Sequence, residues 1–153
     1  MTVEDDIAFF ERVPTLNHLG RQALRILAIG AQTRYVHGGE VLFNAGEEAD
    51  GGYVVQEGRF NLAPASSDGQ GIAVGPYALL GEIALFTEST RSATATALEP
   101  STVLLIPRPL FHKMLDSFPD GARRLRDLFA GRLDQSTTEI GNLRAVLDSY
   151  ERK

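Results

Sequence analysis

The sequence predicts an α+β fold: an antiparallel β-roll (a jelly-roll-like barrel) flanked by N-terminal helices and a C-terminal helix pair. Two patterns carry this prediction. Short β-type segments between glycine-rich turns fill the middle of the chain, and helical periodicity is confined to its two ends. A third observation sets the size: 153 residues, 43% of them hydrophobic, suit one domain with a core of its own plus a short appendage.

The N-terminal segment, from Val3 to about Ile29, is predicted to be helical. We expect two short helices here, one starting at Asp5–Asp6 and the other at Pro14–Thr15. The apolar residues after Pro14 recur close to the helical period, at Leu16, Leu19, Ala23, Ile26 and Leu27.

The middle of the chain, from Tyr35 to Ile106, is predicted to form short strands. Glycines mark most of the turns between them, and within Ser92–Leu98 three alanines alternate with two threonines, which places the alanines on one face. Many short strands favour a β-roll over a parallel βαβ sheet. The expected strands are Val41–Phe43, Tyr53–Gln56, Phe60–Ala63, Ile72–Val74, Ser92–Leu98 and Thr102–Ile106.

The C-terminal part is predicted to hold two helices. Pro109 suits the first turn of one of them, with a core-facing stripe at Phe111, Met114, Leu115 and Phe118. After a break at Pro119–Gly121, a last helix follows with a heptad-like seam. The seam consists of Phe129, Leu133, Ser136, Ile140, Leu143, Leu147 and Tyr150.

A helix with such a seam calls for a partner helix, and packing back onto the β-domain is the alternative. We therefore expect a homodimer through residues 129–150. Charge changes at the same place, since residues 1–120 carry 8 basic and 15 acidic side chains and residues 121–153 carry 7 and 5. We divide the chain into residues 1–135, the helices and β-roll, and residues 121–153, a hinge and dimerisation helix, with no output domain.

Composition excludes several classes of function. The chain has no cysteine, which excludes a thiolate metal site and a cysteine nucleophile, and its three histidines lie far apart. An enzyme of the cupin type needs clustered histidines, so we expect no catalysis, no metal and no cofactor. The net charge of −5 argues against direct nucleic acid binding. No apolar run is long enough to span a membrane and the acidic N-terminus is not a signal peptide, which predicts a cytoplasmic protein.

The segment that carries chemistry is Gly81–Ala97, GEIALFTESTRSATATA. Gly81 and Glu82 open a short apolar helical turn, Ile83–Phe86, whose free N–H groups suit an anionic oxygen. Arg91 follows Glu82 by nine residues and could return to the same spot to grip a phosphate through two N–H groups. A cation, helix amides and a carboxylate together fit a phosphorylated sugar. A structural ion pair between Glu82 and Arg91 is the alternative.

This segment closely resembles the phosphate-binding cassette of the cyclic nucleotide-binding domain family. The family pattern is Gly-Glu-aliphatic-Ala-Leu, a variable loop, and Arg-Ser/Thr/Ala-Ala. The matching residues are Gly81, Glu82, Ile83, Ala84, Leu85, Arg91, Ser92 and Ala93. The upstream segment 37–60 resembles the first hairpins of the family's β-roll, so the likeness runs from about Phe10 to the final helix.

The resemblance implies a role for each matched residue. Arg91 would pair with the exocyclic oxygens of the cyclic phosphate, the backbone amides of the Glu82–Ala84 turn and of Ser92 would share that charge, and Glu82 would accept from the ribose 2′-hydroxyl. Apolar residues expected near the ribose and base are Leu62, Val74, Leu80 and Ala93, for each of which plain core packing is the alternative.

The last helix carries a second likeness. Residues 132–143, RLDQSTTEIGNL, are similar to the dimer helix of catabolite-activator-type members, in which two hydroxyl residues meet the adenine of cyclic AMP. Ser136 and Thr137 occupy the matching positions. The alternative for Ser136 is a hydrogen bond to its own helix. This likeness favours cyclic AMP, while Ser92 keeps cyclic GMP open as the ligand.

The sequence departs from the family before the cassette. Where members often carry a glycine followed by an aromatic, this chain reads Pro76-Tyr77-Ala78-Leu79-Leu80, which would reshape the loop over the ribose. The resemblance implies a sensor or regulatory module that signals through its C-terminal helix. The alternatives are a ligand-free interaction domain of the same fold, and the sensor fragment of a transcription regulator or channel.

Overall fold

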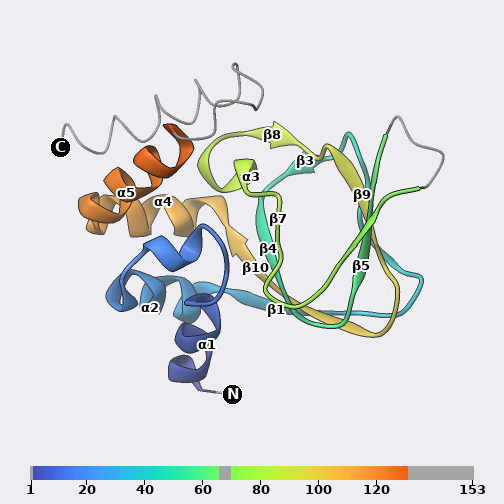
Figure 1. The fold of residues 1–153 in the computed structure, drawn as a ribbon, viewed down its shortest axis with the longest axis horizontal. Helices are drawn as coiled ribbons and strands as arrows, with labels where there is room; N and C mark the ends of the chain where they lie inside the picture. Colours follow the sequence, from blue (N-terminus) through green and yellow to red (C-terminus); the bar gives the residue numbers. More distant parts are fainter. Residues whose placement is uncertain (1, 66–69, 131–153) are drawn as a thin grey trace.

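The computed structural model describes residues 2–65 and 70–130, and it confirms an α+β fold built on an antiparallel jelly roll (Figure 1). The helices are α1 (Val3–Phe10), the 3-10 turn η1 (Leu16–His18), α2 (Arg21–Gly30), α3 (Ile83–Phe86), α4 (Arg108–Ser117) and α5 (Pro119–Ala130). The strands are β1 (Gln32–Val36), β2 (Val41–Phe43), β3 (Glu48–Ala49), β4 (Gly51–Glu57), β5 (Phe60–Pro64), β6 (Ile72–Val74), β7 (Leu79–Leu80), β8 (Ser89–Thr90), β9 (Ala93–Ala97) and β10 (Ser101–Pro107).

Two four-stranded antiparallel sheets make the β-roll. One has the strand order β1-β10-β4-β7 and the other β2-β9-β5-β6, while β3 and β8 form a small separate ladder. Side chains of both large sheets share one buried cluster, so the sheets pack face to face. Among the described strands no ladder joins the two large sheets, so the expected barrel is not closed by hydrogen bonds.

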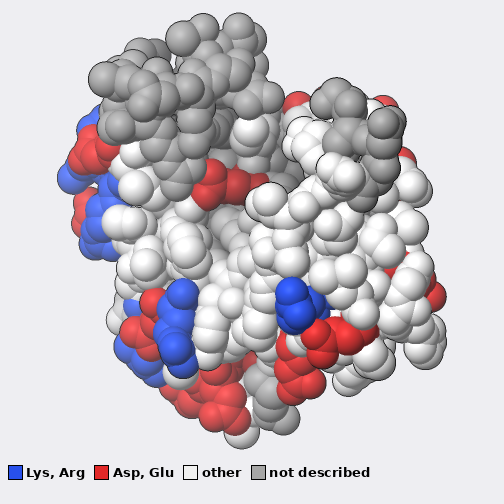
Figure 2. Space-filling model, turned by 45° about the vertical axis from the view of Figure 1, so that its right-hand side comes forward, with Lys and Arg blue, Asp and Glu red and all other residues white. Residues whose placement is uncertain are grey.

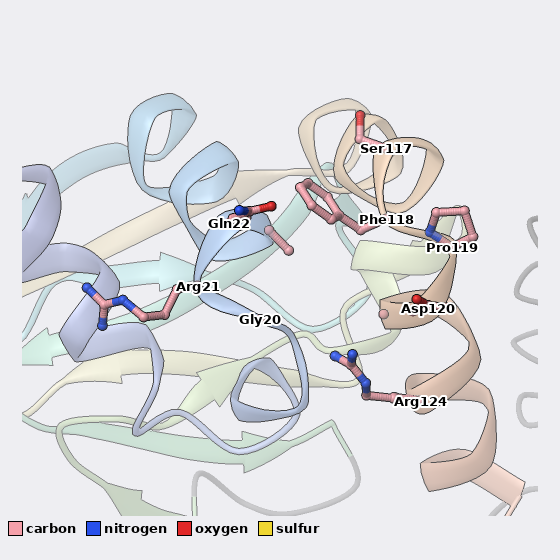
Figure 3. Close-up of a pocket in the computed structure, with 10 residues that line it drawn as sticks. Gly20, Arg21, Gln22, Ser117, Phe118, Pro119, Asp120 and Arg124 are labelled. Atoms are coloured by element: carbon pink, nitrogen blue, oxygen red, sulfur yellow. The ribbon is translucent and has the colours of Figure 1, made fainter.

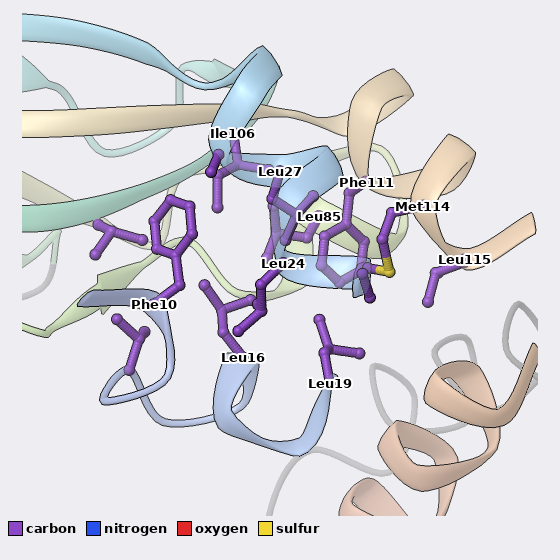
Figure 4. Close-up of a cluster of buried hydrophobic side chains, with 14 of the residues drawn as sticks. Phe10, Leu16, Leu19, Leu24, Leu27, Leu85, Ile106, Phe111, Met114 and Leu115 are labelled. Atoms are coloured by element: carbon purple, nitrogen blue, oxygen red, sulfur yellow. The ribbon is translucent and has the colours of Figure 1, made fainter. Parts of the chain in front are cut away.

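Strand β10 is buried on both faces of its sheet. Val103 and Leu105 point into the roll, and Leu104 and Ile106 point to the helices, as the two-residue period of a strand requires. The helical cluster on the outer face is shown in Figure 4, where Ile106 belongs to the same buried group as Phe10, Leu24, Leu27 and Phe111. Helices α1, α2, α4 and α5 therefore gather at one end of the roll (Figure 1).

The N-terminal helices start at other residues than expected. Helix α1 begins at Val3 because Thr2 caps it, with its hydroxyl accepting from the Asp5 N–H and the Asp5 carboxylate accepting from the Thr2 N–H. The second helix begins at Arg21 rather than at Pro14–Thr15. Thr15 has a left-handed backbone with φ of 76°, and the 3-10 turn η1 follows it. Helix α2 therefore starts only after Gly20.

Helix α4 follows the predicted stripe, since Phe111, Met114 and Leu115 are fully buried. Helix α5 begins at Pro119 itself rather than after Gly121, because proline suits a first helical turn. The seam beyond α5, Ser136, Thr137 and the expected dimer segment from residue 131 onward lie outside the described residues.

The helices of the described parts include none that is both long and apolar enough to cross a bilayer. The face of the molecule in Figure 2 carries its basic and acidic side chains in small groups, without a continuous basic area.

Candidate functional site

Arg91 is held at the mouth of the β-roll, between β8 and β9. Its backbone is fixed by two bonds to the β2–β3 loop: the Arg91 N–H donates to the Glu47 carbonyl at 2.8 Å, and the Gly46 N–H donates to the Arg91 carbonyl at 2.8 Å. The side chain is only 4% exposed. The loop therefore buries an arginine, which is uncommon unless the charge has a partner.

The Arg91 guanidinium lies against two aromatic rings and one carboxylate. Its Cζ atom is 4.4 Å from the Phe43 ring centroid and 5.4 Å from that of Tyr53. The Nη2 atom is 3.6 Å from Oδ1 of Asp50, whose side chain is 71% exposed. Burial lowers the pKa of the Arg91 guanidinium, and the nearby Tyr53, Asp50 and Glu47 act in the opposite direction.

One guanidinium nitrogen of Arg91 is left without an acceptor. Within the described parts of the chain, Nη1 is buried and makes no hydrogen bond. A buried donor without a partner costs free energy, and the cost is greater for a charged group. This atom is therefore a place at which an anionic oxygen would be stabilised.

Gly81 lies directly beside this nitrogen. A Cβ built on Gly81 would overlap with Nη1 of Arg91, and the glycine has a left-handed φ of 79°. The positive φ favours glycine at this position, and any side chain here would have to displace the Arg91 guanidinium. The structure thus brings Arg91 back to the residue that precedes Glu82, at the start of α3.

A cavity of about 380 Å³ opens at Arg91. Its lining balances charge, with three arginines and three carboxylates around an apolar wall. The lining residues are Arg34, Leu42, Phe43, Glu47, Glu48, Ala49, Asp50, Tyr53, Arg91 and Arg108. Burial raises the pKa of the Tyr53 hydroxyl, which accepts a hydrogen bond from Nη1 of Arg34 at 2.7 Å. Tyr53 therefore stays a neutral phenol between two arginines.

The carboxylate of Glu82 is engaged elsewhere. The hydroxyl of Thr15, which is 2% exposed, donates a hydrogen bond to Oε2 of Glu82. Glu82 is not among the residues that line the Arg91 cavity. The structure therefore brings Gly81 and Arg91 together and holds the Glu82 carboxylate against the N-terminal segment.

The predicted turn Ile83–Phe86 is a helix, α3, with the expected bounds. The Ala84 N–H bonds the Gly81 carbonyl at 3.0 Å, so this amide closes the turn itself. Helix α4 holds the other end of α3. Nη1 of Arg108 lies within hydrogen-bond distance of the Ala84 and Thr87 carbonyls, at 3.2 and 3.3 Å, and the Nε2 of His112 lies 2.8 Å from the Phe86 carbonyl.

The remaining predicted contacts belong to the roll. Leu80 is buried, and Leu62 and Val74 pack partly buried against the same cluster. Ala93 is partly exposed at the start of β9, and Ser92 is exposed beside Arg91. Ser136 and Thr137, expected near the base, lie outside the described residues.

Sequence reasoning missed the residues that surround Arg91 and Glu82, among them Phe43, Asp50, Tyr53 and Thr15. Each lies far from the Gly81–Ala97 segment along the chain, and none belongs to the motif. Only the alternation of Phe43 and Tyr53 toward the inside of the roll offered a signal, and that signal equally fits an ordinary core.

A second cleft, of about 360 Å³, lies between the start of α2 and the α4–α5 corner (Figure 3). Its two arginines already have partners, since Nη1 of Arg124 donates to the His18 carbonyl at 3.0 Å and Arg21 pairs with Glu4 and Glu11. None of the sequence-predicted site residues lines this cleft.

Comparisons with known proteins agree with the fold and with the family that the sequence resembles. A family model described as the cyclic nucleotide-binding domain matches residues 33–118. A solved structure of a cyclic nucleotide-binding-like protein from Brucella abortus is 33% identical, with a TM-score of 0.65 over 73% of this chain and 98% of that one. The N-terminal domain of a transcriptional regulator from Streptomyces coelicolor is 31% identical, with a TM-score of 0.72 over 82% of this chain and 90% of that one.

Curated relatives are much longer than this chain. A lysophospholipase of Pyricularia oryzae is 30% identical over 125 residues, which make up 76% of this chain and 8% of that protein. The chain thus corresponds to one small part of that relative.

Proposed function

The chain belongs to the cyclic nucleotide-binding domain family, and we propose that it is a non-catalytic sensor that binds cyclic AMP at Arg91 and signals through its C-terminal helix. The observation that carries this proposal is the buried Nη1 of Arg91, which makes no hydrogen bond within the described residues. A cyclic phosphate would supply the acceptor that this donor needs.

The aromatic rings explain how Arg91 would be ready for such a ligand. Phe43 and Tyr53 hold the plane of the guanidinium, so little side-chain entropy is lost when its two N–H groups bind two phosphate oxygens. Asp50 supports the charge from one side at 3.6 Å and is itself largely exposed, so a phosphate could replace it at small cost.

The rest of the nucleotide would lie between α3 and the roll. Glu82 would accept from the ribose 2′-hydroxyl, and the apolar surface of the roll would cover the base. The amides of the Glu82–Ala84 turn and of Ser92 would share the phosphate charge, with the Ala84 N–H giving up its bond to the Gly81 carbonyl to do so. The residues proposed for that surface are Leu62, Val74, Leu80 and Ala93. Their partial burial at the roll's core supports this role for Leu62 and Val74.

Cyclic AMP is preferred over cyclic GMP on the evidence of the sequence. Ser136 and Thr137 match the adenine-contacting hydroxyl residues of catabolite-activator-type members. Ser92 follows Arg91 and could bond a guanine, which makes cyclic GMP the competitor to test.

The contacts between α3 and α4 support a route for the signal. Arg108 and His112 hold the carbonyl end of α3, and the rings of Phe86 and Phe111 meet edge to face at 5.1 Å. A ligand that shifts the start of α3 would therefore move α4 and the helix after it. The C-terminal helix would have two arrangements relative to the rest of the protein. The ligand would favour the arrangement in which the protein binds it more tightly.

A ligand-free interaction domain of the same fold is the second candidate. One observation favours it: Asp50 and Thr15 already give Arg91 and Glu82 protein partners. In that case the unbonded Nη1 of Arg91 would serve no purpose.

Titration calorimetry with cyclic AMP and cyclic GMP separates the two candidates. We expect cyclic AMP to bind the wild type, and binding to fall at least a hundredfold in Arg91→Ala, because a buried charge-assisted pair is lost. Arg25→Ala is the matched control, since Arg25 pairs with Glu4 on the surface, 53% exposed and outside the cavity. The absence of heat with millimolar ligand in the wild type would favour the interaction domain.

We propose that the sensor is a homodimer through residues 129–150. The heptad-like spacing of that segment supports this assembly. Sedimentation of the wild type and of Leu143→Asp tests it, with a dimer expected for the first and a monomer for the second. A monomer in both would remove the argument from the seam.

A further inference from the structure

The N-terminal segment meets the loop before α3 at two strained residues. Thr15 and Tyr77 have φ angles of 76° and 74°, and they are the non-glycine residues with a left-handed backbone in the described parts of the chain. Such a conformation is strained and persists only where the surroundings impose it. The contacts of the two residues show what imposes it here.

Tyr77 is held between two side chains of the N-terminal segment. The Phe9 ring stacks on it at 4.6 Å between centroids, and Cζ of Arg12 lies 4.3 Å from its ring centroid. Nη1 of Arg12 also donates to the Tyr77 hydroxyl at 2.7 Å. Tyr77 lies shortly before Gly81, and this clamp accounts for a tyrosine in a backbone conformation that favours glycine.

Thr15 is held by Glu82. Its side chain is buried, and its hydroxyl donates to Oε2 of the Glu82 carboxylate. The left-handed backbone of a β-branched residue is unfavourable, and the bond to a carboxylate offsets part of that cost. The same bond keeps Glu82 out of the lining of the Arg91 cavity.

We propose that the segment Phe9–Thr15, called here the latch, competes with the nucleotide for Glu82. This inference rests on the proposed function, in which Glu82 accepts from the ribose 2′-hydroxyl. Thr15 presents the same chemical group, an O–H donor, to the same carboxylate. Ligand binding exchanges one hydroxyl for the other, turns Glu82 into the cavity and releases the strain at Thr15.

The exchange gives the latch a second consequence. Once Thr15 is free of Glu82, the bond from Arg12 to the Tyr77 hydroxyl is the hydrogen bond described above that still ties the segment to the loop before α3, while Phe10 and Val13 stay packed in the core cluster. The turn from Phe9 to Val13, closed by the Arg12 N–H to the Phe9 carbonyl and the Val13 N–H to the Phe10 carbonyl, then opens more often. The N-terminal helix thereby reports occupancy along with the C-terminal one.

Thr15→Val tests the latch, because valine keeps the β-branch and removes the hydroxyl. We expect Thr15→Val to bind cyclic AMP about tenfold more tightly than the wild type, since a hydrogen bond to a charged group no longer has to be broken. Thr15→Ser keeps the hydroxyl and is the matched control, with an affinity within about threefold of the wild type. If Thr15→Val does not fold, Phe9→Leu serves in its place. This variant removes the ring that stacks on Tyr77 and so loosens the latch, and we expect it to bind cyclic AMP more tightly than the wild type.

The ligand itself provides the sharper control. With 2′-deoxy cyclic AMP, which lacks the competing hydroxyl, Thr15→Val and the wild type are expected to bind equally. Hydrogen exchange at Arg12 and Val13 is expected to speed up in the wild type on saturation with cyclic AMP and to stay unchanged with the deoxy ligand.

The outcomes separate the latch from the proposed function. If Thr15→Val binds cyclic AMP as tightly as the wild type or more weakly, the latch is overturned while the sensor function stands. Weaker binding would mean that Thr15 holds Glu82 in place for the ligand. Slower exchange at Arg12 and Val13 on ligand binding also overturns it. The absence of binding in the wild type and in Thr15→Val alike overturns the function and the latch with it.

Discussion

Nη1 of Arg91 occupies the space in which a side chain on residue 81 would begin, so a Cβ added to Gly81 would overlap with it. The two residues are separated by α3 and the loop after it, and the chain folds back until the guanidinium lies against Gly81. The proposed phosphate site therefore depends on a missing side chain as much as on a charged one.

Gly81→Ala is expected to weaken cyclic AMP binding, with at least a tenfold loss of affinity in calorimetry. The methyl group displaces the Arg91 guanidinium, and the left-handed φ of 79° adds strain that lowers the free energy of unfolding by about 1–3 kcal/mol.

Gly39→Ala is the matched control for Gly81→Ala. Gly39 has a similar φ of 84° and no atom within 4 Å of an added Cβ, so it carries the backbone strain without the overlap. We expect Gly39→Ala to lose as much stability as the strain costs Gly81→Ala, and to bind cyclic AMP like the wild type. If both variants bound cyclic AMP like the wild type, the guanidinium position at Gly81 would be irrelevant to the ligand.

Tyr53→Phe is expected to change how the free energy of unfolding depends on pH above about pH 10. Burial raises the pKa of the Tyr53 hydroxyl, so above about pH 10 the unfolded chain loses this proton while the folded protein keeps it. The free energy of unfolding of the wild type therefore falls as pH rises from about 10 to the folded pKa, and this component is absent in the phenylalanine variant.

Urea unfolding at pH 8 and at several values above pH 10 measures the difference between the two proteins. At pH 8 the variant is expected to be about 1 kcal/mol less stable, since it loses the hydrogen bond from Arg34. The gap is expected to narrow with rising pH. A gap that widens above pH 10 would contradict the assignment.

Arg108→Lys is expected to loosen the junction between α3 and α4. One nitrogen of Arg108 lies within hydrogen-bond distance of three carbonyls, of Ala49 at 2.9 Å and of Ala84 and Thr87 at 3.2 and 3.3 Å. Lysine keeps the charge, but its amine ends one bond short of the position of Nη1, which leaves part-buried carbonyls unpaired. We expect a loss of about 1–3 kcal/mol in thermal or urea unfolding.

Arg59→Lys is the control for Arg108→Lys. Within the described parts of the chain, Arg59 forms hydrogen bonds through its backbone, to Ser101 and Leu98, and a lysine would keep them. Its stability is expected to stay within about 0.5 kcal/mol of the wild type. A similar result for Arg108→Lys would show that the bonds of Arg108 contribute nothing to the fold.

The fold was predictable where local signals are strong. The strands Val41–Phe43 and Ile72–Val74 and the helix Ile83–Phe86 have the predicted bounds, because glycine turns and apolar runs delimit them. Strand β1 starts earlier than the predicted β region, since Gln32–Tyr35 is an exposed edge with no apolar alternation. The two-residue strands β3, β7 and β8 are too short to leave a pattern.

The candidate site was predictable only as far as the motif reaches. The motif indicated that Arg91 returns to the start of α3, but nothing local places Phe43 and Tyr53 against it. Thr15 offered even less, because its bond to Glu82 depends on how the N-terminal segment crosses the cassette. Contacts between distant segments are decided by packing, which one sequence does not reveal.

Cyclic AMP binding is expected to depend weakly on salt. The cavity holds the arginines Arg34, Arg91 and Arg108 together with Glu47, Glu48 and Asp50, so its lining has no net charge, and the whole chain carries −5. No long-range field attracts an anionic ligand, and the affinity must come from short contacts with a guanidinium that is buried and poorly screened. Calorimetry at 50 and 200 mM NaCl is expected to give dissociation constants within about threefold of each other, in contrast to the 10³-fold or larger losses typical of proteins that contact many phosphates. A tenfold or greater loss over this range would mean that exposed charges, and not Arg91, supply most of the binding.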